Sequence, residues 1–198
     1  MTLPYALDEA AQNLLFRDAR TANTFAAEPV GEEAERAIVD LMKWAPTSMN
    51  SQPMRIVWVR SDPARERLLG HLSEGNRPKT AGAPLVAVLA VDTAFHDRFA
   101  EVFPHFPGAR DLFLDDDRRV TWGTTQAWMQ AAYFVIAVRA AGYAAGPMMG
   151  FDSAGLDADL LAGTGLRSIC VVNIGKPGDN AWQQRLPRLA HDTVCRTL

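Results

Sequence analysis

The clearest pattern in the first third of the chain is a stripe of apolar residues at helical spacing. Ala34, Ile38 and Leu41 recur three or four positions apart, which predicts an amphipathic helix over Gly31 to Trp44. Pro46 should end this helix, because the residue before a proline is pushed out of the helical conformation. The polar stretch that follows, up to residue 53, predicts an irregular loop.

Three further runs predict strands. The β-branched run Arg55 to Arg60 follows the polar loop. Leu85 to Val91 is continuously apolar between Pro84 and Asp92, and Ser168 to Ile174 has the same character, which is typical of strands covered on both faces. Strands that alternate with helical segments favour a layered fold of helices around one central sheet.

The segment Thr124 to Gly142 predicts a helix that is apolar on nearly every side, with Arg139 as its only charge. A helix of this kind must be buried all round. Since one small core rarely wraps a helix of about 19 residues completely, we expect part of it to pack against a second subunit. An obligate homodimer interface typically buries about 2,000 Å² or more.

Residues 93–122 show no clear period and are rich in Phe, Pro, His and Asp. They could form a lid over a binding site. They could equally form a solvated connector that carries the acidic run Asp115 to Asp117 on its surface.

Length and composition limit the remaining choices. With 198 residues, 48% of them hydrophobic, the chain fits a single globular domain, residues 1–198. A net charge of −3 with interspersed signs predicts neither nucleic acid nor a membrane surface as partner. Residues Met1 to Ala10 lack the basic and apolar blocks of a secretory signal, and the free-thiol pattern of Cys170 and Cys195 fits a cytoplasmic protein.

The usual catalytic motifs are missing from the sequence. The four histidines are isolated from one another and from cysteine, so no metal site is predicted. No GxSxG, Walker or GxGxxG motif follows a predicted strand. If the chain is an enzyme, a bound cofactor must supply its chemistry.

What remains is a set of polar loops at the boundaries of predicted elements: Arg20 to Asn23, Pro46 to Asn50, Asn76 to Lys79, Gly146 to Gly150 and Arg185 to Arg188. Taken singly, each is as easily a cap, a turn or a surface charge. In this order, with the strings FRDARTAN, LMKWAPTSMNSQPMRIV, MQAAY, GPMMGFD and NIG followed by RLPRL, the chain resembles the nitroreductase family of FMN-dependent NAD(P)H oxidoreductases over almost its whole length. The likeness is greatest to the branch of malonic semialdehyde reductases.

The resemblance implies an α+β fold of three layers, α/β/α, around a central mixed sheet, in an intertwined homodimer with two FMN sites at the subunit interface. Arg20, Thr21 and Asn23 match the element that holds the FMN phosphate and ribityl chain, and Arg185 and Arg188 match the C-terminal segment that completes the phosphate site. Arginine suits this role because its fork of permanently charged donors fits a phosphate. Many relatives have a basic residue where Asn23 stands, so Asn23 ranks below Arg20.

By the same resemblance, other loops would surround the flavin ring. Asn76 and Lys79 match an N-x-x-K element at the pyrimidine edge, where a cation stabilises the reduced flavin. Pro46, Thr47, Ser48 and Asn50 match a loop from the partner subunit, and Pro147, Met148, Met149 and Gly150 match a turn whose N–H groups face flavin N5 and O4. Hydride would pass from NADH or NADPH to N5 and on to the acceptor, so no catalytic side chain is expected.

The branch implies malonic semialdehyde as acceptor, reduced to 3-hydroxypropionate in pyrimidine degradation. Arg110, in the candidate lid beside Phe103 and His105, is the hypothetical partner of its carboxylate. Two other readings stay open: a broad reductase of nitroaromatics or quinones, and a module that binds FMN without turnover.

Overall fold

The computed structural model describes residues 5–198, so Met1 to Pro4 of the N-terminal segment discussed above lie outside it. Its centre is one four-stranded sheet in the order β1-β2-β4-β3. The strands are β1 (Met54–Val59), β2 (Leu85–Asp92), β3 (Ala144–Met148) and β4 (Leu166–Gly175). All three pairings are antiparallel, so the expectation of a mixed sheet is wrong for the strands of this chain.

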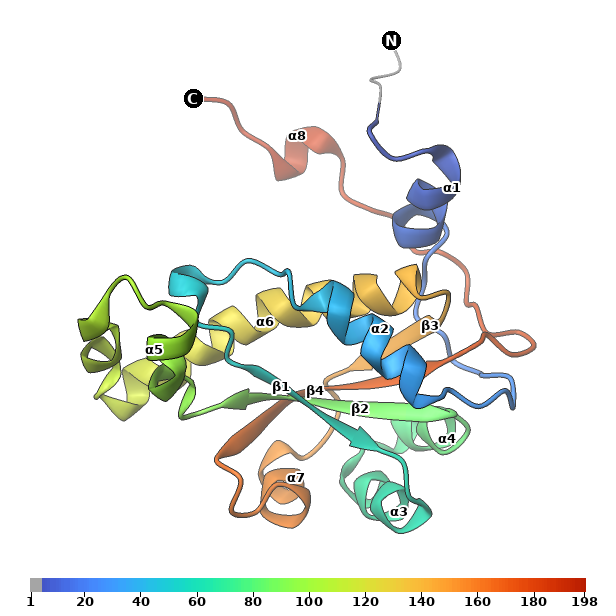
Figure 1. Ribbon diagram of the computed structural model, residues 1–198. Helices are drawn as coiled ribbons and strands as arrows, with labels where there is room; N and C mark the ends of the chain where they lie inside the picture. Colours follow the sequence, from blue (N-terminus) through green and yellow to red (C-terminus); the bar gives the residue numbers. More distant parts are fainter. Residues whose placement is uncertain (1–4) are drawn as a thin grey trace.

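Helices cover both faces of the sheet, which confirms the three-layer α+β arrangement (Figure 1). On one face lie α2 (Glu32–Met42) and α6 (Asp116–Ala140). On the other lie α3 (Asp62–His71), α4 (Arg77–Ala81) and α7 (Ser153–Leu160).

Strand β2 shows why the sheet needs both layers of helices. Leu85 and Leu89 pack on the side of Ile38 and Phe134, whereas Val86 and Val88 pack on the side of Leu68 and Leu156. Residues Leu85–Val91 are all buried, as their continuous apolar run predicted. Successive side chains of a strand point to opposite faces, so an uninterrupted apolar run requires cover on both.

Helix α6 differs from the prediction at its start. It begins at Asp116 rather than Thr124, because the carboxylate of Asp115 caps it by accepting from the N–H of Arg118 at 2.8 Å. The acidic run is therefore the cap and first turn of a helix, where negative charge is favourable. The last seven residues of the candidate lid belong to α6.

Helix α6 is also not buried on every side within the chain. Beyond its first turn, its exposed positions form one stripe, made of Thr121, Thr125, Met129, Ala132, Tyr133 and Ala140. Met129 and Tyr133 are 44% and 41% exposed. An apolar stripe along a long central helix is the kind of surface that a partner covers.

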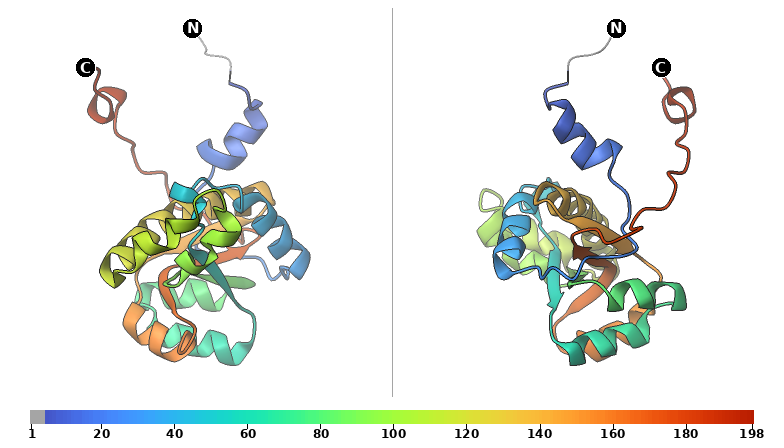
Figure 2. Two further views of the ribbon diagram at one scale, coloured as in Figure 1. Left: turned by 60° about the vertical axis from the view of Figure 1, so that its left-hand side comes forward. Right: turned by 90° about the vertical axis from the view of Figure 1, so that its right-hand side faces the viewer.

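The two ends of the chain project beyond the layer of α2 and α6 (Figures 1 and 2). The N-terminal segment carries α1 (Glu9–Gln12) and η1 (Asn13–Arg17), and the C-terminal segment carries α8 (His191–Val194). Both expose large apolar side chains, including Phe16 and Leu189. The remaining short helical elements are η2 (Ser48–Asn50), η3 (Glu74–Asn76), η4 (Phe95–Arg98), α5 (Phe99–Val102) and η5 (Pro107–Phe113).

Helix α6 is the longest helix, but its charges and polar groups keep it from qualifying as a membrane span. Across residues 5–198, no helix combines the length and the apolar character needed to cross a bilayer.

Candidate functional site

The N-terminal segment lies along the outer edge of β3. The N–H of Ala22 approaches the carbonyl of Ala145 at 3.4 Å, and the N–H of Asn23 donates to the carbonyl of Ala181 at 3.0 Å. A Cβ at Gly146 would lie only 3.1 Å from the carbonyl oxygen of Ala22, so the close approach depends on this glycine. The predicted Arg20 to Asn23 element is thus fixed beside the predicted β3 turn.

The C-terminal segment joins the same place through two arginines. Arg20 Nη1 donates to the carbonyl of Gln183 at 3.0 Å, and Arg185 Nη2 donates to the carbonyl of Ala19 at 3.1 Å. The structure therefore places the segments that carry Arg20 and Arg185 side by side, and their role in phosphate binding stays a prediction. Arg188 is exposed and donates only to the carbonyls of Leu186 and Pro187, so no described contact ties it to the other two arginines.

Asn76 meets the other end of β3. Its Nδ2 donates to the carbonyl of Gly150 at 2.9 Å, and the N–H of Ser73 donates to the same oxygen at 3.0 Å. A Cβ on Gly150 would lie 2.7 Å from Asn76 Nδ2 and 2.8 Å from Ser73 Oγ. The turn after β3 is therefore closely cradled by the segment that precedes α4.

Lys79 belongs to α4, which its neighbour Thr80 anchors to β3 and β4. The buried Asn173 of β4 donates from Nδ2 to Thr80 Oγ1 at 3.1 Å, and that hydroxyl lies 3.7 Å from the sulfur of Met148. Lys79 itself is half-buried, and within the described chain it has no hydrogen bond or ion pair of its own. We call the group gathered along this strand the β3 half-site: Arg20, Thr21, Asn23, Asn76, Lys79, Pro147, Met148, Met149, Gly150 and Arg185.

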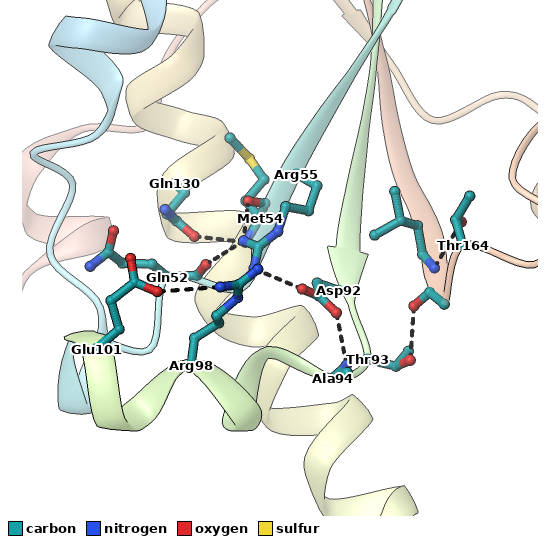
Figure 3. Close-up of polar contacts among 12 residues, drawn as sticks. Gln52, Met54, Arg55, Asp92, Thr93, Ala94, Arg98, Glu101, Gln130 and Thr164 are labelled. Carbon is teal, nitrogen blue, oxygen red and sulfur yellow. Dashed lines mark hydrogen bonds and ion pairs between the residues drawn. The ribbon is translucent and has the colours of Figure 1, made fainter. Parts of the chain in front are cut away.

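The loop from Pro46 to Asn50 lies elsewhere, held by two glutamines of α6. Gln126 Oε1 accepts from the N–H of Ser48 at 2.7 Å, and Gln130 Oε1 accepts from the N–H of Met54 at 2.9 Å. Figure 3 shows the Gln130 contact next to Arg55, whose guanidinium bonds Gln52 O and Asp92. Both glutamines are buried, so the loop backbone is fixed to the helix.

The backbone of this loop is strained. Met49, Asn50 and Gln52 have φ values of 55°, 49° and 41°, in the left-handed region that residues with a side chain rarely adopt. Strain of this kind is kept only where the surroundings impose it, and it clusters at functional sites.

Residues 93–122 pack against the same loop. Asn50 Nδ2 donates to the carbonyl of Val102 at 2.8 Å, and Met49 contacts an aromatic cluster built on Phe95 and Phe113. The segment therefore has a small core of its own. We call the following group the loop half-site: Pro46, Thr47, Ser48, Asn50, Phe103, His105 and Arg110.

The predicted substrate residues lie on this small core. The rings of Phe103 and His105 are 4.0 Å apart between centroids. Arg110 is already paired, because its Nε donates to Asp97 Oδ1 at 2.7 Å. The Arg110 guanidinium holds the pKa of the Asp97 carboxyl below its usual value.

The two half-sites lie beside different stretches of α6, one near its middle and one at its C-terminal end. Gln126 anchors the loop half-site, whereas Arg139 lies in the last turn, next to the segments that carry Arg20 and Arg185. At 1.5 Å per residue, these two positions are about 20 Å apart along the helix. No hydrogen bond or ion pair within residues 5–198 joins the two groups.

Sequence reasoning missed three residues at these places. Gln126 and Gln130 stand four positions apart in an apolar helix, so they lie on the same face of it. Two polar side chains on one face of a buried helix indicate buried hydrogen bonds. Arg139 was noticed only as the single charge of the helix. The structure places its side chain beside the β3 half-site.

Other titratable groups offer no alternative centre. Among the described residues, no group of three or more His, Cys, Asp or Glu side chains is arranged to hold a metal ion. Burial raises the pKa of the Cys170 thiol to about 11, so this cysteine stays protonated and unreactive.

The β3 half-site fits a ligand that carries a phosphate. The Nε atoms of Arg20 and Arg139 are buried without an acceptor, although buried donors nearly always have one. At Gly146 and Gly150 a Cβ would crowd Ala22, and Asn76 and Ser73, respectively, so the two glycines let these segments pack closely against β3 and the turn that follows it.

Comparison with known proteins identifies the family. The model of the Nitroreductase family matches residues 17–176, and the chain belongs to that family. A protein of Streptomyces griseus is 55% identical over 193 residues, which is 97% of this chain and 98% of that protein. It carries the provisional name of NADH dehydrogenase/NAD(P)H nitroreductase.

Solved structures share the fold at much lower identity. A nitroreductase, provisionally so named, from Bacillus subtilis superposes with a TM-score of 0.84 at 18% identity, over 96% of this chain and 100% of that one. Another from Exiguobacterium sibiricum, solved in complex with FMN, has a TM-score of 0.82 at 15% identity over 100% of both chains. The predicted resemblance to nitroreductases is confirmed.

Proposed function

We propose that the protein is an FMN-dependent oxidoreductase that passes hydride from NADH or NADPH to a small organic acceptor. The observation that carries the proposal is the gathering of Arg20, Arg185, Asn76 and the Pro147 to Gly150 turn along one strand edge, from four separate parts of the sequence. Bound FMN would take up hydride from the donor and release it to the acceptor, chemistry that the side chains alone do not supply.

The residues of the β3 half-site divide the task of holding this cofactor. Arg20 and Arg185, with Thr21, Asn23 and Arg188, would bind the phosphate and ribityl chain, since forked guanidinium donors suit a phosphate. Asn76 and Lys79 would bind the pyrimidine edge. The backbone from Pro147 to Gly150 would lie along the flavin, next to Asn76, which can approach the turn because Gly150 has no side chain.

The complete site requires two chains. Gln126 and Arg139, the α6 residues next to the two half-sites, are about 20 Å apart along the helix, so we expect a flavin held by the β3 half-site to leave the loop half-site of the same chain out of contact. In a homodimer, the partner's loop half-site would cover it. The exposed stripe of Met129 and Tyr133, and the projecting terminal segments, support such an intertwined dimer.

The acceptor proposed from the branch resemblance is malonic semialdehyde. Arg110 is the candidate for its carboxylate, and the Asp97 pair would have to exchange for the substrate. Replacing Arg110 by alanine should then raise the Michaelis constant for malonic semialdehyde, and an unchanged constant rules out this role. Residues 93–122, with their aromatic cluster, would border the acceptor.

A broad nitroaromatic or quinone reductase is the second candidate. The name carried by the Streptomyces griseus relative favours it, as do the exposed aromatic side chains near Phe103. A protein that only binds FMN is a third reading, and it requires that neither NADH nor NADPH reduce the bound flavin.

The first experiment is purification and release of the flavin. Yellow protein that releases FMN on denaturation, and that is bleached by NADH or NADPH under anaerobic stopped flow, supports the proposal. Turnover of malonic semialdehyde should then be compared with that of a quinone and a nitroarene. Colourless protein that takes up no added FMN would refute the cofactor assignment and everything derived from it.

A further inference from the structure

A cavity of about 270 Å³ lies where the two terminal segments cross the end of α6. Its walls are partly apolar, from Leu14, Tyr143 and Trp182. Arg20 and Arg139 also line it. The cavity is therefore continuous with the β3 half-site but includes one arginine that sequence reasoning did not assign.

The Arg139 side chain is held by one hydrogen bond, and one of its buried donors has no acceptor. Its Nη1 donates to the carbonyl of Leu15 at 3.0 Å, which orients the guanidinium from the last turn of α6 towards the N-terminal segment. Its Nε is buried and has no acceptor, and the same is true of Arg20 Nε. Arg20 and Arg139, which both line this cavity, thus each have a buried Nε–H donor without an acceptor.

The charges around the cavity are unbalanced. Burial, and then the nearby guanidinium of Arg185, lower the pKa of Arg139. Asp18 also lines the cavity, yet none of Arg20, Arg139 and Arg185 forms an ion pair within the described part of the chain. Three cations that converge without a carboxylate partner repel one another, and a bound anion relieves that repulsion.

We infer that Arg139 is a third arginine of the phosphate subsite and contacts the phosphate monoester of the cofactor together with Arg20 and Arg185. The inference rests on the proposed function. It assigns a role to a residue of the central helix, whereas the other two arginines come from the terminal segments. A phosphate presents acceptor oxygens in several directions, so it can meet donors from three sides.

The test compares FMN with riboflavin, which lacks the phosphate. Apoprotein of the wild type and of Arg139→Gln is titrated with each flavin, and binding is followed by quenching of flavin fluorescence. Loss of one charge-assisted contact should weaken FMN binding about 10- to 100-fold. Riboflavin binding should stay within about twofold, because no contact to the ring is removed.

Two further variants separate this role from a structural one. Arg139→Lys keeps a cation in the last turn of α6, where positive charge also interacts favourably with the helix dipole. It loses the forked donors of the guanidinium. Its FMN affinity should therefore lie between those of the wild type and Arg139→Gln. Arg119→Gln is the matched control: Arg119 also donates to main-chain carbonyls, those of Thr93 and Phe113, from the opposite end of α6. It should leave the ratio of FMN to riboflavin affinity unchanged.

The outcomes are distinguishable. Equal ratios in wild type and Arg139→Gln overturn the inference and leave the proposed function standing. A weaker dimer with an unchanged ratio, measured by sedimentation, overturns it too and assigns Arg139 to the subunit interface. Wild-type protein that binds neither flavin refutes the proposed function itself.

Discussion

The β3 half-site and the loop half-site are built in opposite ways. The first gathers segments that are far apart in the sequence, and it is joined by arginines that donate to main-chain carbonyls, as Arg20 does to Gln183 and Arg185 to Ala19. The second combines the loop from Pro46 to Asn50, which Gln126 of α6 holds, with residues of the 93–122 segment that packs against that loop. The first therefore depends on how the two terminal segments meet β3, whereas the second depends on the α6 side chains that fix the loop and the start of β1.

The difference indicates how the halves work together. Each half-site is held in place by hydrogen bonds within its own chain. Gln126 and Arg139, the α6 residues next to the two half-sites, are about 20 Å apart along the helix. In the proposed homodimer a second copy places its loop half-site over the β3 half-site, so we expect the exposed stripe of α6 to control both assembly and cofactor binding.

The largest effect is expected from a charge in this stripe. Tyr133→Asp would bury an unpaired carboxylate in the proposed interface, at a cost of several kcal/mol. Sedimentation should show monomers, and FMN binding should fall together with dimerisation. Ala158→Asp, exposed on α7 in the opposite layer, is the control and should leave the dimer intact. A monomer that binds FMN as tightly as the wild type contradicts the two-chain site.

The next effect tests the anchoring of the loop. Gln130→Leu leaves the N–H of Met54, a buried residue, without an acceptor and should lower the free energy of unfolding by about 1–3 kcal/mol. Denaturant titration measures this loss. Gln126→Leu should cost less, because the Ser48 N–H that it serves is only partly buried. An unchanged stability of Gln130→Leu would mean that the loop is held by other contacts.

A smaller and more local effect is expected at Gly150. The Cβ of Gly150→Ala would displace Asn76 from the Gly150 carbonyl, at the expense of one neutral hydrogen bond, so FMN affinity should fall up to about tenfold. Flavin titration measures it. Gly75→Ala, in the same turn but with open space around its Cβ, should bind FMN normally. If the two variants behave alike, the cradle around Gly150 has no part in binding.

The smallest effect concerns the exposed Arg110 and Asp97 pair. Because the pKa of Asp97 is lowered in the folded protein, the pair stabilises the fold above the usual carboxyl pKa of 3.8, and this contribution is lost as the pH falls through the folded value. Arg110→Ala should therefore cost at most about 1 kcal/mol at pH 7. Melting curves of the two proteins should converge at acidic pH, once Asp97 is protonated in the folded wild type. A difference that persists there would mean that Arg110 stabilises the segment in another way.

The sequence pattern predicted β1, β2, β4 and α2 well, since each buries an apolar pattern, but it did not predict β3 (Ala144–Met148) as a strand. The bounds of β1, β2 and β4 lie within two residues of the predicted ones. Helices α3 and α7 left no comparable signal, because each buries a single side chain, Leu68 and Leu156. The start of α6 was missed because Asp115 to Asp117 looked like a solvated connector, although a cap is what such residues provide.

The candidate site was predictable only in part. The polar loops could be singled out from their residues, and the resemblance of the chain to nitroreductases is confirmed. Arg139 could not be assigned, because its role depends on how the terminal segments cross the end of α6.

The sequence by itself determined β1, β2, β4 and α2, the family and the residue types available for binding, because periodicity and local propensity act between near neighbours. The tertiary structure decided that the sheet is antiparallel, that the segments of Arg20 and Arg185 lie side by side, and that the predicted loops gather beside two different stretches of α6. These features arise from contacts between residues far apart in the chain, and no local pattern specifies which distant partners will meet.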